Sequence, residues 1–255
     1  SSVLLDGKNV LYITLEMAEE RIAERIDANL MNVPIQDLKD LPKKMFDDRV
    51  TKIKNKIDGK LIIKEYPTAS AHAGHFKALL QELKLKRSFT PDIIFVDYLN
   101  ICTSQRFRAG SSANSYTIIK SIAEELRGLA VEQDLPIVSA TQTTRSGYGS
   151  SDVDLTDTSE SFGLPATADL MFALISTEEL EAQQQMMVKQ LKNRYSDPTS
   201  NKRFMVGVDR SKMRLFDLAD SVQKQITDSG QDDGPVFDNS SFGTKFAGKF
   251  EEFKL

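Results

Sequence analysis

The sequence has few of the residues that build disulfides and structural metal sites. Its 255 residues include one cysteine, Cys102, and two histidines, His72 and His75. A single cysteine excludes an intramolecular disulfide and fits a reducing compartment. Two histidines and one cysteine cannot complete a zinc site without several carboxylates. We therefore expect the histidines to lie in a loop and a helix cap, and Cys102 to pack in the core.

Long apolar segments are also missing. No apolar run approaches the roughly 18 residues that suggest a membrane-spanning helix. The N-terminal stretch SSVLLDGKNV lacks the basic and apolar regions of a signal peptide. We expect no membrane segment and a cytoplasmic location. The composition, 40% apolar and 27% charged, is typical of a globular protein and excludes global disorder.

An excess of charge is absent from most of the chain. The whole sequence has 33 basic and 37 acidic residues, but residues 1–216 contain 29 of each, so the C-terminal stretch carries the entire excess of acid. A neutral body has no general electrostatic attraction for nucleic acid. Any such binding must therefore come from local loops.

The C-terminal stretch divides into two parts. Residues 219–240 are acidic and rich in turn formers, which predicts a flexible linker. Residues 241–255 carry Phe242, Phe246 and Phe250 at helical spacing, which predicts an amphipathic, Phe-rich tail. Such a tail either docks on a partner protein or folds back on its own domain, and both alternatives stay open.

Strand-like and helix-like segments alternate through residues 1–218, which we predict to be one domain. β-branched apolar runs predict strands, and apolar residues at i, i+4 spacing predict helices. The expected strands are 10–16, 61–66, 92–97, 136–142, 169–176, 185–193, 203–209 and 214–218, and the expected helices are 18–31, 43–57, 74–86 and 115–133. This order predicts an α/β fold, with a mostly parallel sheet, helices on both of its faces, and antiparallel C-terminal strands at its edge.

Three of the expected strands end in polar residues. Asp97 ends the run IIFVD, Glu16 follows VLYITL, and Gln142 follows PIVSAT. In open α/β sheets, ligands bind at the carboxyl ends of strands. There an Asp can hold a Mg²⁺ that bridges nucleotide phosphates, a second acid can activate water, and an amide can sense the γ-phosphate. Apolar strands often end in polar residues that have no function. The hypothesis of a nucleotide site therefore depends on the three residues together and not on any one of them.

A nucleotide site also needs a loop that holds phosphate, G-x-x-x-x-G-K-[ST] between a strand and a helix. Residues 243–249 match only G-x-x-x-x-G-K, since Phe250 replaces Ser or Thr and no apolar strand precedes them. Gly7-Lys8 lacks the upstream glycine. The sequence therefore shows the catalytic half of a nucleotide site without the half that holds phosphate.

Four segments together resemble a known family. They are LYITLEM (11–17), PDIIFVDYLNI (91–101), IVSATQTTR (137–145) and SESFGLPATADLMFAL (159–174). In order and spacing they are similar to the motifs of the DnaB-like replicative hexameric helicases, which have a RecA-like P-loop NTPase core. The T-even-phage type is especially similar through residues 7–30. The resemblance extends over about residues 5–218.

The resemblance implies roles for several residues in an ATP site with Mg²⁺. Glu16 corresponds to the catalytic glutamate that polarises water, Asp97 to the acid that binds Mg²⁺, and Gln142 to the γ-phosphate sensor. Arg145 belongs to the network beside that sensor. The family has a Lys-x-Arg pair that reaches into a neighbouring subunit's ATP site, and its counterpart here is Lys192 with Arg194; the alternative is a solvated hairpin.

The resemblance also implies two loops that bind single-stranded DNA. The first follows Asp97 and contains Arg106 and Arg108, which are expected to contact phosphates; the alternative is two exposed arginines on a loop. The second precedes Asp169 and includes Glu160 and Gly163. There the chain has Ser159 and Phe162 where bacterial members commonly carry Arg and Gly, a departure that affects the phosphate contact.

The resemblance implies a motor of DNA replication. Its expected partners are single-stranded DNA, further copies in a hexameric ring, a primase and a helicase loader, in the cytoplasm of an infected bacterial host. Only six residues precede Gly7, so we expect a fragment that begins in the last turn of the phosphate-loop helix and, alone, hydrolyses ATP weakly or not at all. The alternatives are a recombinase-like or clock-like ATPase and a non-catalytic RecA-fold scaffold.

Overall fold

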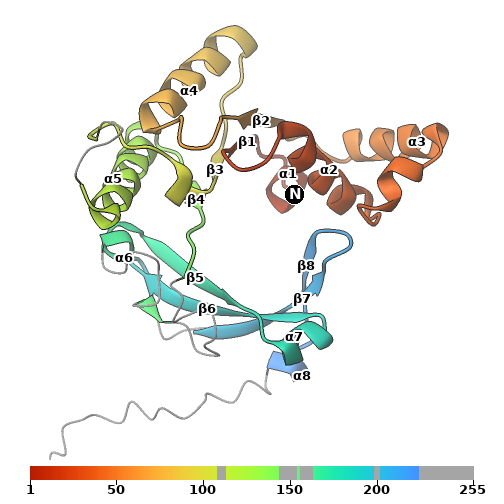
Figure 1. Ribbon diagram of the computed structural model, residues 1–255. Helices are drawn as coiled ribbons and strands as arrows, with labels where there is room; N and C mark the ends of the chain where they lie inside the picture. The colour runs from red at the N-terminus through yellow and green to blue at the C-terminus, as the bar shows by residue number, and fades with distance from the viewer. Residues whose placement is uncertain (108–112, 144–153, 156–162, 198–201, 224–255) are drawn as a thin grey trace, which may run out of the picture. The chain divides into compact units, whose positions relative to one another are not determined.

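The computed structural model describes residues 1–107, 113–143, 154–155, 163–197 and 202–223 (Figure 1). The chain divides into two compact units, Ser1–Leu218 and Ala219–Leu255. The second unit is described only at its start, which includes the short helix α8 (Asp220–Gln223). The predicted Phe-rich tail and most of the predicted linker lie outside the described residues.

The first half of the chain forms a parallel sheet with the strand order β2-β1-β3-β4. All three strand pairs are parallel, so each connection has to cross over the sheet. The strands are β1 (Val10–Thr14), β2 (Leu61–Glu65), β3 (Ile93–Asp97) and β4 (Ile137–Ser139). The short helices are α1 (Ser2–Leu5), η1 (Asp37–Asp40) and η2 (Leu99–Ile101), and the longer ones are α2 (Glu19–Met31), α3 (Lys43–Lys54), α4 (Ala73–Arg87) and α5 (Ser115–Gln133).

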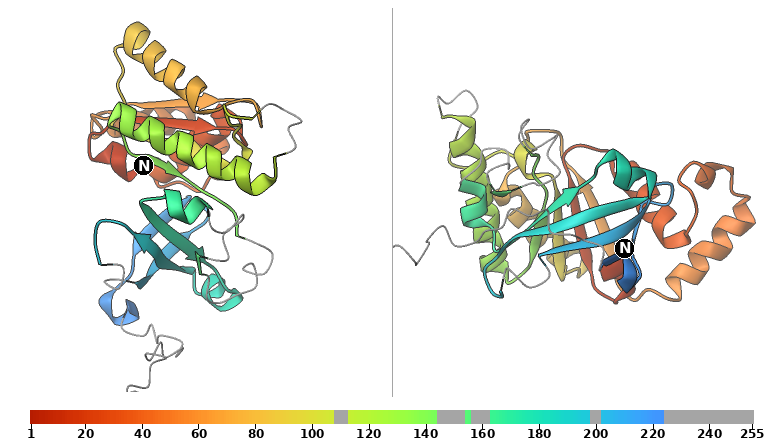
Figure 2. Two further views of the ribbon diagram at one scale, coloured as in Figure 1. Left: turned by 90° about the vertical axis from the view of Figure 1, so that its left-hand side faces the viewer. Right: turned by 90° about the horizontal axis from the view of Figure 1, so that it is seen from below.

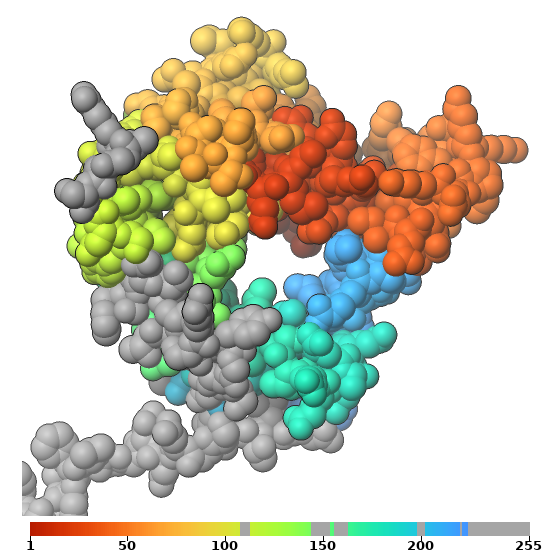
Figure 3. All heavy atoms as spheres, in the orientation of Figure 1, coloured from red at the N-terminus to blue at the C-terminus, as the bar shows by residue number. Residues whose placement is uncertain are grey.

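The long helices cover both faces of this sheet, as the sequence predicts. The chain moves from β1 to β2 in one direction and from β2 through β3 to β4 in the other. Right-handed crossovers therefore place α2 on one face and α4 and α5 on the opposite face, an arrangement that Figures 1 and 2 show. Helix α3 has no fully buried residue and lies on the surface (Figure 3).

The main core lies between the sheet and the helices α4 and α5. Alternate residues of the two central strands point to this face because the side-chain period of a strand is two. The buried cluster contains Leu11 and Ile13 of β1, Ile94 and Val96 of β3, Phe76 and Leu80 of α4, and Ile122 and Leu126 of α5. On the opposite face, the half-buried rings of Tyr12 and Phe95 stack with their centroids 6.2 Å apart.

The cysteine and the histidines have the structural places expected of them. Cys102 is buried in the main core, and burial raises the pKa of its thiol to about 12. His72 caps α4: its Nδ1 accepts a hydrogen bond from the Gly74 N–H, and its own N–H donates to Nδ1 of His75. Within the described ranges, no helix is long and apolar enough to cross a membrane.

The second half of the chain forms an antiparallel sheet in sequence order, β5 to β8. Its strands are β5 (Leu170–Ile175), β6 (Gln185–Asn193), β7 (Arg203–Asp209) and β8 (Arg214–Asp217), with α6 (Gly163–Thr167) before β5 and α7 (Glu178–Ala182) before β6. The predicted antiparallel strands are confirmed. They form a sheet of their own, however, because no described strand pair joins β4 to β5, so the expectation that they extend the edge of the parallel sheet is wrong for the described residues.

Two strands end earlier than the sequence predicts. Strand β1 ends at Thr14 rather than at residue 16, and β4 ends at Ser139 rather than at 142. After β4 the Ala140 carbonyl accepts a hydrogen bond from the Leu99 N–H at 3.2 Å. Ala140 therefore does not continue the regular pairing of β4 with β3, which ends at Ser139. Glu16 and Gln142 therefore lie in turns just beyond the strands.

We predict that Phe76→Ala destabilises the protein by about 3–5 kcal/mol, because it leaves a cavity where a fully buried ring packs. Leu85→Ala, on the same helix but 84% exposed, is the matched control and should change stability by less than about 0.5 kcal/mol. Urea denaturation measures both free energies of unfolding. Equal losses for the two variants would contradict the assignment of the core.

Candidate functional site

The carboxyl ends of the parallel strands share one edge of the sheet. The register pairs Thr14 of β1 with Asp97 of β3, and the Leu15 N–H donates to the Asp97 carbonyl at 2.8 Å. Glu16 follows directly, and Gln142 lies three residues beyond the end of β4. The structure thus places Glu16, Asp97 and Gln142 at the same edge; their chemical roles stay predictions.

A phenol on the neighbouring strand holds the carboxylate of Asp97. Tyr12 Oη donates to Asp97 Oδ2 at 2.8 Å. Burial, followed by this hydrogen bond, raises the pKa of Tyr12, so the phenol remains a donor at neutral pH. No hydrogen bond from the described part of the chain reaches the other oxygen, Oδ1.

An Asp97 oxygen that no described residue engages fits a Mg²⁺ ion that is bound together with a nucleotide. Magnesium in phosphate-transfer sites is held by one or two carboxylates, substrate phosphates and waters rather than by a cage of protein ligands. The described residues contain no cluster of three or more acids, histidines or cysteines that would form such a cage. The Asp97 carboxylate could serve as one such ligand; this role stays a prediction.

The backbone beside Glu16 is fixed by a buried threonine. Thr14 is fully buried, and its Oγ1 donates to the Met17 carbonyl at 2.9 Å and accepts from the Met17 N–H at 3.0 Å. This pair of bonds closes the turn over Leu15 and Glu16. Glu16 is exposed and lies in the turn that these two bonds close.

The segment after β4 is tied to the segment after β3. Gln142 Nε2 donates to Tyr98 Oη at 3.2 Å, and Thr141 Oγ1 donates to Asn100 Oδ1 at 2.8 Å. The proposed sensor amide therefore contacts the residue that follows Asp97. Arg145, the expected network member, lies outside the described residues.

Lys192 and Arg194 form a second cluster, at the end of β6. Lys192 Nζ donates to the carbonyls of Pro165 at 2.5 Å and Ala166 at 3.2 Å, and Arg194 Nη2 donates to the Ala166 carbonyl at 3.0 Å. Both cations thus bind carbonyls of α6, where helix carbonyls lack partners within the helix. Desolvation, and then the charge of Arg194, lower the pKa of Lys192.

One carboxylate organises this cluster. Asp169 Oδ1 lies 2.9 Å from Arg194 Nε and 3.1 Å from Arg127 Nη2. The hydrogen bond to Asp169 raises the pKa of Arg127. Sequence reasoning missed the roles of Arg127 and Asp169, because Arg127 looks like any polar residue of an amphipathic helix and the contact depends on how α5 packs.

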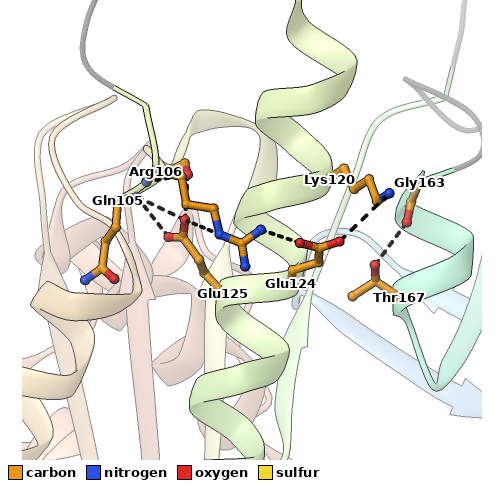
Figure 4. Close-up of polar contacts among 8 residues, drawn as sticks. Gln105, Arg106, Lys120, Glu124, Glu125, Gly163 and Thr167 are labelled. Carbon is orange, nitrogen blue, oxygen red and sulfur yellow. Dashed lines mark hydrogen bonds and ion pairs between the residues drawn. The ribbon is translucent and has the colours of Figure 1, made fainter. Parts of the chain in front are cut away.

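Arg106, expected on the first DNA loop, is ion-paired in this structure. It pairs with Glu124 on α5 and lies 4.0 Å from Glu125 (Figure 4). The Glu125 side chain is only 8% exposed and accepts hydrogen bonds from Ser104 Oγ at 2.5 Å and from the Gln105 N–H at 3.0 Å. Glu125 therefore anchors the start of the loop, and phosphate would have to compete with Glu124 for Arg106.

Gly163, expected on the second DNA loop, is the buried first residue of α6. A Cβ at this position would lie 3.0 Å from the Lys120 side chain, so α6 packs closely on α5 here. Its carbonyl accepts a hydrogen bond from Thr167 Oγ1 at 3.0 Å (Figure 4). Arg108 and Glu160 lie outside the described residues, as do Ser159 and Phe162.

Comparison with known proteins identifies relatives. The family model of the DnaB-like helicase C terminal domain matches residues 2–211. A DnaB-like replicative helicase of Enterobacteria phage T4 is 46% identical over 226 residues, which cover 87% of this chain and 47% of the relative. A replicative DNA helicase DnaB of Helicobacter pylori is 27% identical over 176 residues, 68% of this chain and 35% of the relative. The chain thus spans about half the length, or less, of these curated relatives.

Solved structures share the fold. A structure of a DnaB-like replicative helicase that describes its interactions with primase superposes with a TM-score of 0.68 at 17% identity, over 84% of this chain and 51% of that one. A second solved structure, of an isolated ATPase domain, superposes with a TM-score of 0.67 at 17% identity, over 84% of this chain and 76% of that one. These matches confirm the RecA-like α/β fold.

We predict that Glu125→Ala destabilises the protein by about 1–3 kcal/mol, because it leaves the buried Ser104 hydroxyl without its acceptor and removes the hydrogen bond of the exposed Gln105 N–H. Its neighbour Glu124 is the matched control: Glu124→Ala removes a partly exposed ion pair and should cost less than about 1 kcal/mol. Thermal or urea unfolding measures the difference. The anchoring role of Glu125 is wrong if Glu124→Ala costs as much.

Proposed function

Because this chain belongs to the family of DnaB-like helicase C-terminal domains, we propose that it is the ATP-driven motor of a replicative DNA helicase. The observation that carries the proposal is the joint match in sequence and fold. The family model covers residues 2–211, and the same residues place two acids and an amide at the carboxyl edge of a parallel sheet. The proposed activity is translocation on single-stranded DNA and unwinding of the duplex.

In the proposed ATP site each residue at the sheet edge has a separate task. Glu16, exposed on its rigid turn, orients and polarises the attacking water. Asp97 would hold Mg²⁺ through Oδ1, and the ion would supply positive charge beside the phosphates. Gln142 contacts Tyr98 and is the group proposed to report on the γ-phosphate. Arg145 is proposed to lie beside it.

Lys192 and Arg194 are proposed to act on the ATP of a neighbouring copy. A guanidinium offsets the negative charge that grows on the transferred phosphoryl group in the transition state. This task requires a ring in which each site lies between two subunits, and a hexamer is the ring that we propose. The structural neighbour whose interactions with primase are described supports a primase partner as a proposal. A helicase loader is a further proposed partner, which the family resemblance implies.

Single-stranded DNA is proposed to bind through the two loops that the resemblance implies. Arg106 and Arg108 on the first loop would neutralise phosphates, and the second loop would contribute Glu160 and the backbone of Gly163. The 46% identical relative comes from a phage, which supports replication in the cytoplasm of an infected bacterium as the setting. Strand displacement by the full-length protein, with ATP and Mg²⁺, tests the proposal against a recombinase-like or clock-like ATPase.

We predict that Glu16→Gln in the full-length protein lowers the rate of ATP hydrolysis by roughly 10²–10⁴-fold, because the amide cannot polarise water. Nucleotide binding should persist. Glu20→Gln, an exposed acid one turn further along, is the matched control and should keep the rate. Phosphate release and fluorescent-nucleotide binding measure the two properties, and an active Glu16→Gln variant would exclude the role of Glu16.

We predict that Arg106→Ala weakens binding to single-stranded DNA and reduces the slope of log affinity against log salt concentration by about 0.7, the value for one phosphate contact. Arg87→Ala, at the exposed C-terminal end of α4, serves as the control and should leave the slope unchanged. Fluorescence anisotropy over a range of salt concentrations measures both. An unchanged slope for Arg106→Ala would mean that Arg106 only pairs with Glu124.

A further inference from the structure

The cluster around Asp169 contains a third basic residue, Arg127, besides Lys192 and Arg194, to which the proposed function gives a role. Arg127 and Arg194 both pair with this carboxylate, and Lys192 shares the Ala166 carbonyl with Arg194. They come from α5 and from the end of β6, whereas Asp169 directly precedes β5. The carboxylate therefore holds together groups that would otherwise repel one another.

Asp169 fixes Arg194 by both its main chain and its side chain. The Arg194 N–H donates to the Asp169 carbonyl at 2.9 Å, and Nε lies 2.9 Å from Asp169 Oδ1. Arg194 Nη2 donates to the Ala166 carbonyl, so the guanidinium contacts the protein through this hydrogen bond and through the ion pair of Nε with Asp169. Among the described residues no hydrogen bond engages the third nitrogen, Nη1. Because the guanidinium is planar, the contacts of Nη2 and Nε also restrict the directions in which Nη1 can donate.

Arg127 in turn ties Asp169 to the long helix α5. Its Nη2 donates to Asp169 Oδ1, the oxygen that Arg194 also uses. Both ion pairs are partly exposed, so they add little to the stability of the fold. Without Asp169 the Arg194 guanidinium would lie near two other cations with no carboxylate to pair with, so the carboxylate favours the observed direction of Arg194.

We infer that Asp169 is a positioning residue for the reaction in trans: it orients the Arg194 guanidinium toward the ATP of the neighbouring subunit. The inference rests on the proposed function, since it requires Arg194 to act across an interface. A residue that orients a transition-state group changes kcat and leaves the KM for ATP unchanged.

The test uses the full-length protein with Asp169→Asn, which keeps the shape of the side chain and removes its charge. We expect kcat for ATP hydrolysis to fall about tenfold or more, with KM for ATP within about twofold of the parent protein. Glu181→Gln removes an exposed ion pair of similar length, 2.8 Å to Arg210, and is the control that should keep kcat. Thermal unfolding of both variants shows that they are folded, and Asp169→Glu should recover part of the lost rate.

Mixed oligomers separate a role in trans from a structural one. Glu16→Gln removes the site's own catalytic group, and Arg194→Ala removes the neighbour's, so mixing these two variants creates interfaces with both groups intact and restores hydrolysis. Asp169→Asn should restore hydrolysis when it is mixed with Glu16→Gln and should fail when it is mixed with Arg194→Ala. This pattern is the expected result.

Other patterns overturn the inference in distinguishable ways. If Asp169→Asn restores activity with Arg194→Ala instead, Asp169 serves its own subunit's site. If it restores activity with neither variant, or if KM rises with kcat unchanged, its role is structural or in ATP binding. If Glu16→Gln and Arg194→Ala fail to complement each other, Arg194 does not act across an interface, and the proposed trans role falls together with the inference.

Discussion

The register between β1 and β3 is the constraint on which the proposed ATP site depends. Because Thr14 pairs with Asp97, the chain leaves both strands at the same level, and the turn that follows places Glu16 beside the end of β3. The same register puts Tyr12 and Asp97 on one face, where the phenol reaches the carboxylate. A shift of one residue would send Asp97 to the face that packs against α4 and α5. Because Ile94 and Val96 are buried in the main core on that face, the packing of the core keeps Asp97 on the opposite face of the sheet.

The sequence alone was sufficient for the elements and for the shared edge, but not for the side-chain partners. Periodicity predicts the bounds of α5 and of β6 as the structure has them, because both are long and strongly patterned. It extends β4 too far, since nothing in PIVSATQ shows that Ala140 leaves the ladder to accept from Leu99. Parallel strands share a carboxyl edge, so the meeting of Glu16, Asp97 and Gln142 follows from topology. The contacts of Tyr12 and Arg127 follow from register and helix packing, which a single sequence does not encode in any local pattern.

The basic residues assigned to ligands have protein partners in this structure. Arg106 pairs with Glu124, and Arg194 and Lys192 bind Asp169 or carbonyls of α6. Such contacts do not argue against ligand binding. Exposed ion pairs contribute about 0–1 kcal/mol, whereas a phosphate carries more charge and offers several acceptors, so exchange of partners is energetically feasible. The contacts do orient each cation in the absence of a ligand. Arg194 is oriented by two of them, the ion pair with Asp169 and the hydrogen bond to the Ala166 carbonyl.

Helix α5 links the two parts of the proposed machinery. Near its middle, Glu124 and Glu125 hold the start of the first loop, and on the same turn Arg127 pairs with Asp169, which in turn pairs with Arg194. On the same helix Lys120 packs against Gly163 at the start of α6. Coupling between sites requires an element that both sites contact and that moves as a unit. An α-helix with a buried face meets this requirement, because its hydrogen-bonded backbone resists bending while its packing sets its position. In the proposed motor, Glu124, Glu125 and Arg127 therefore attach the first loop and the Arg194 cluster to the same turn of one helix.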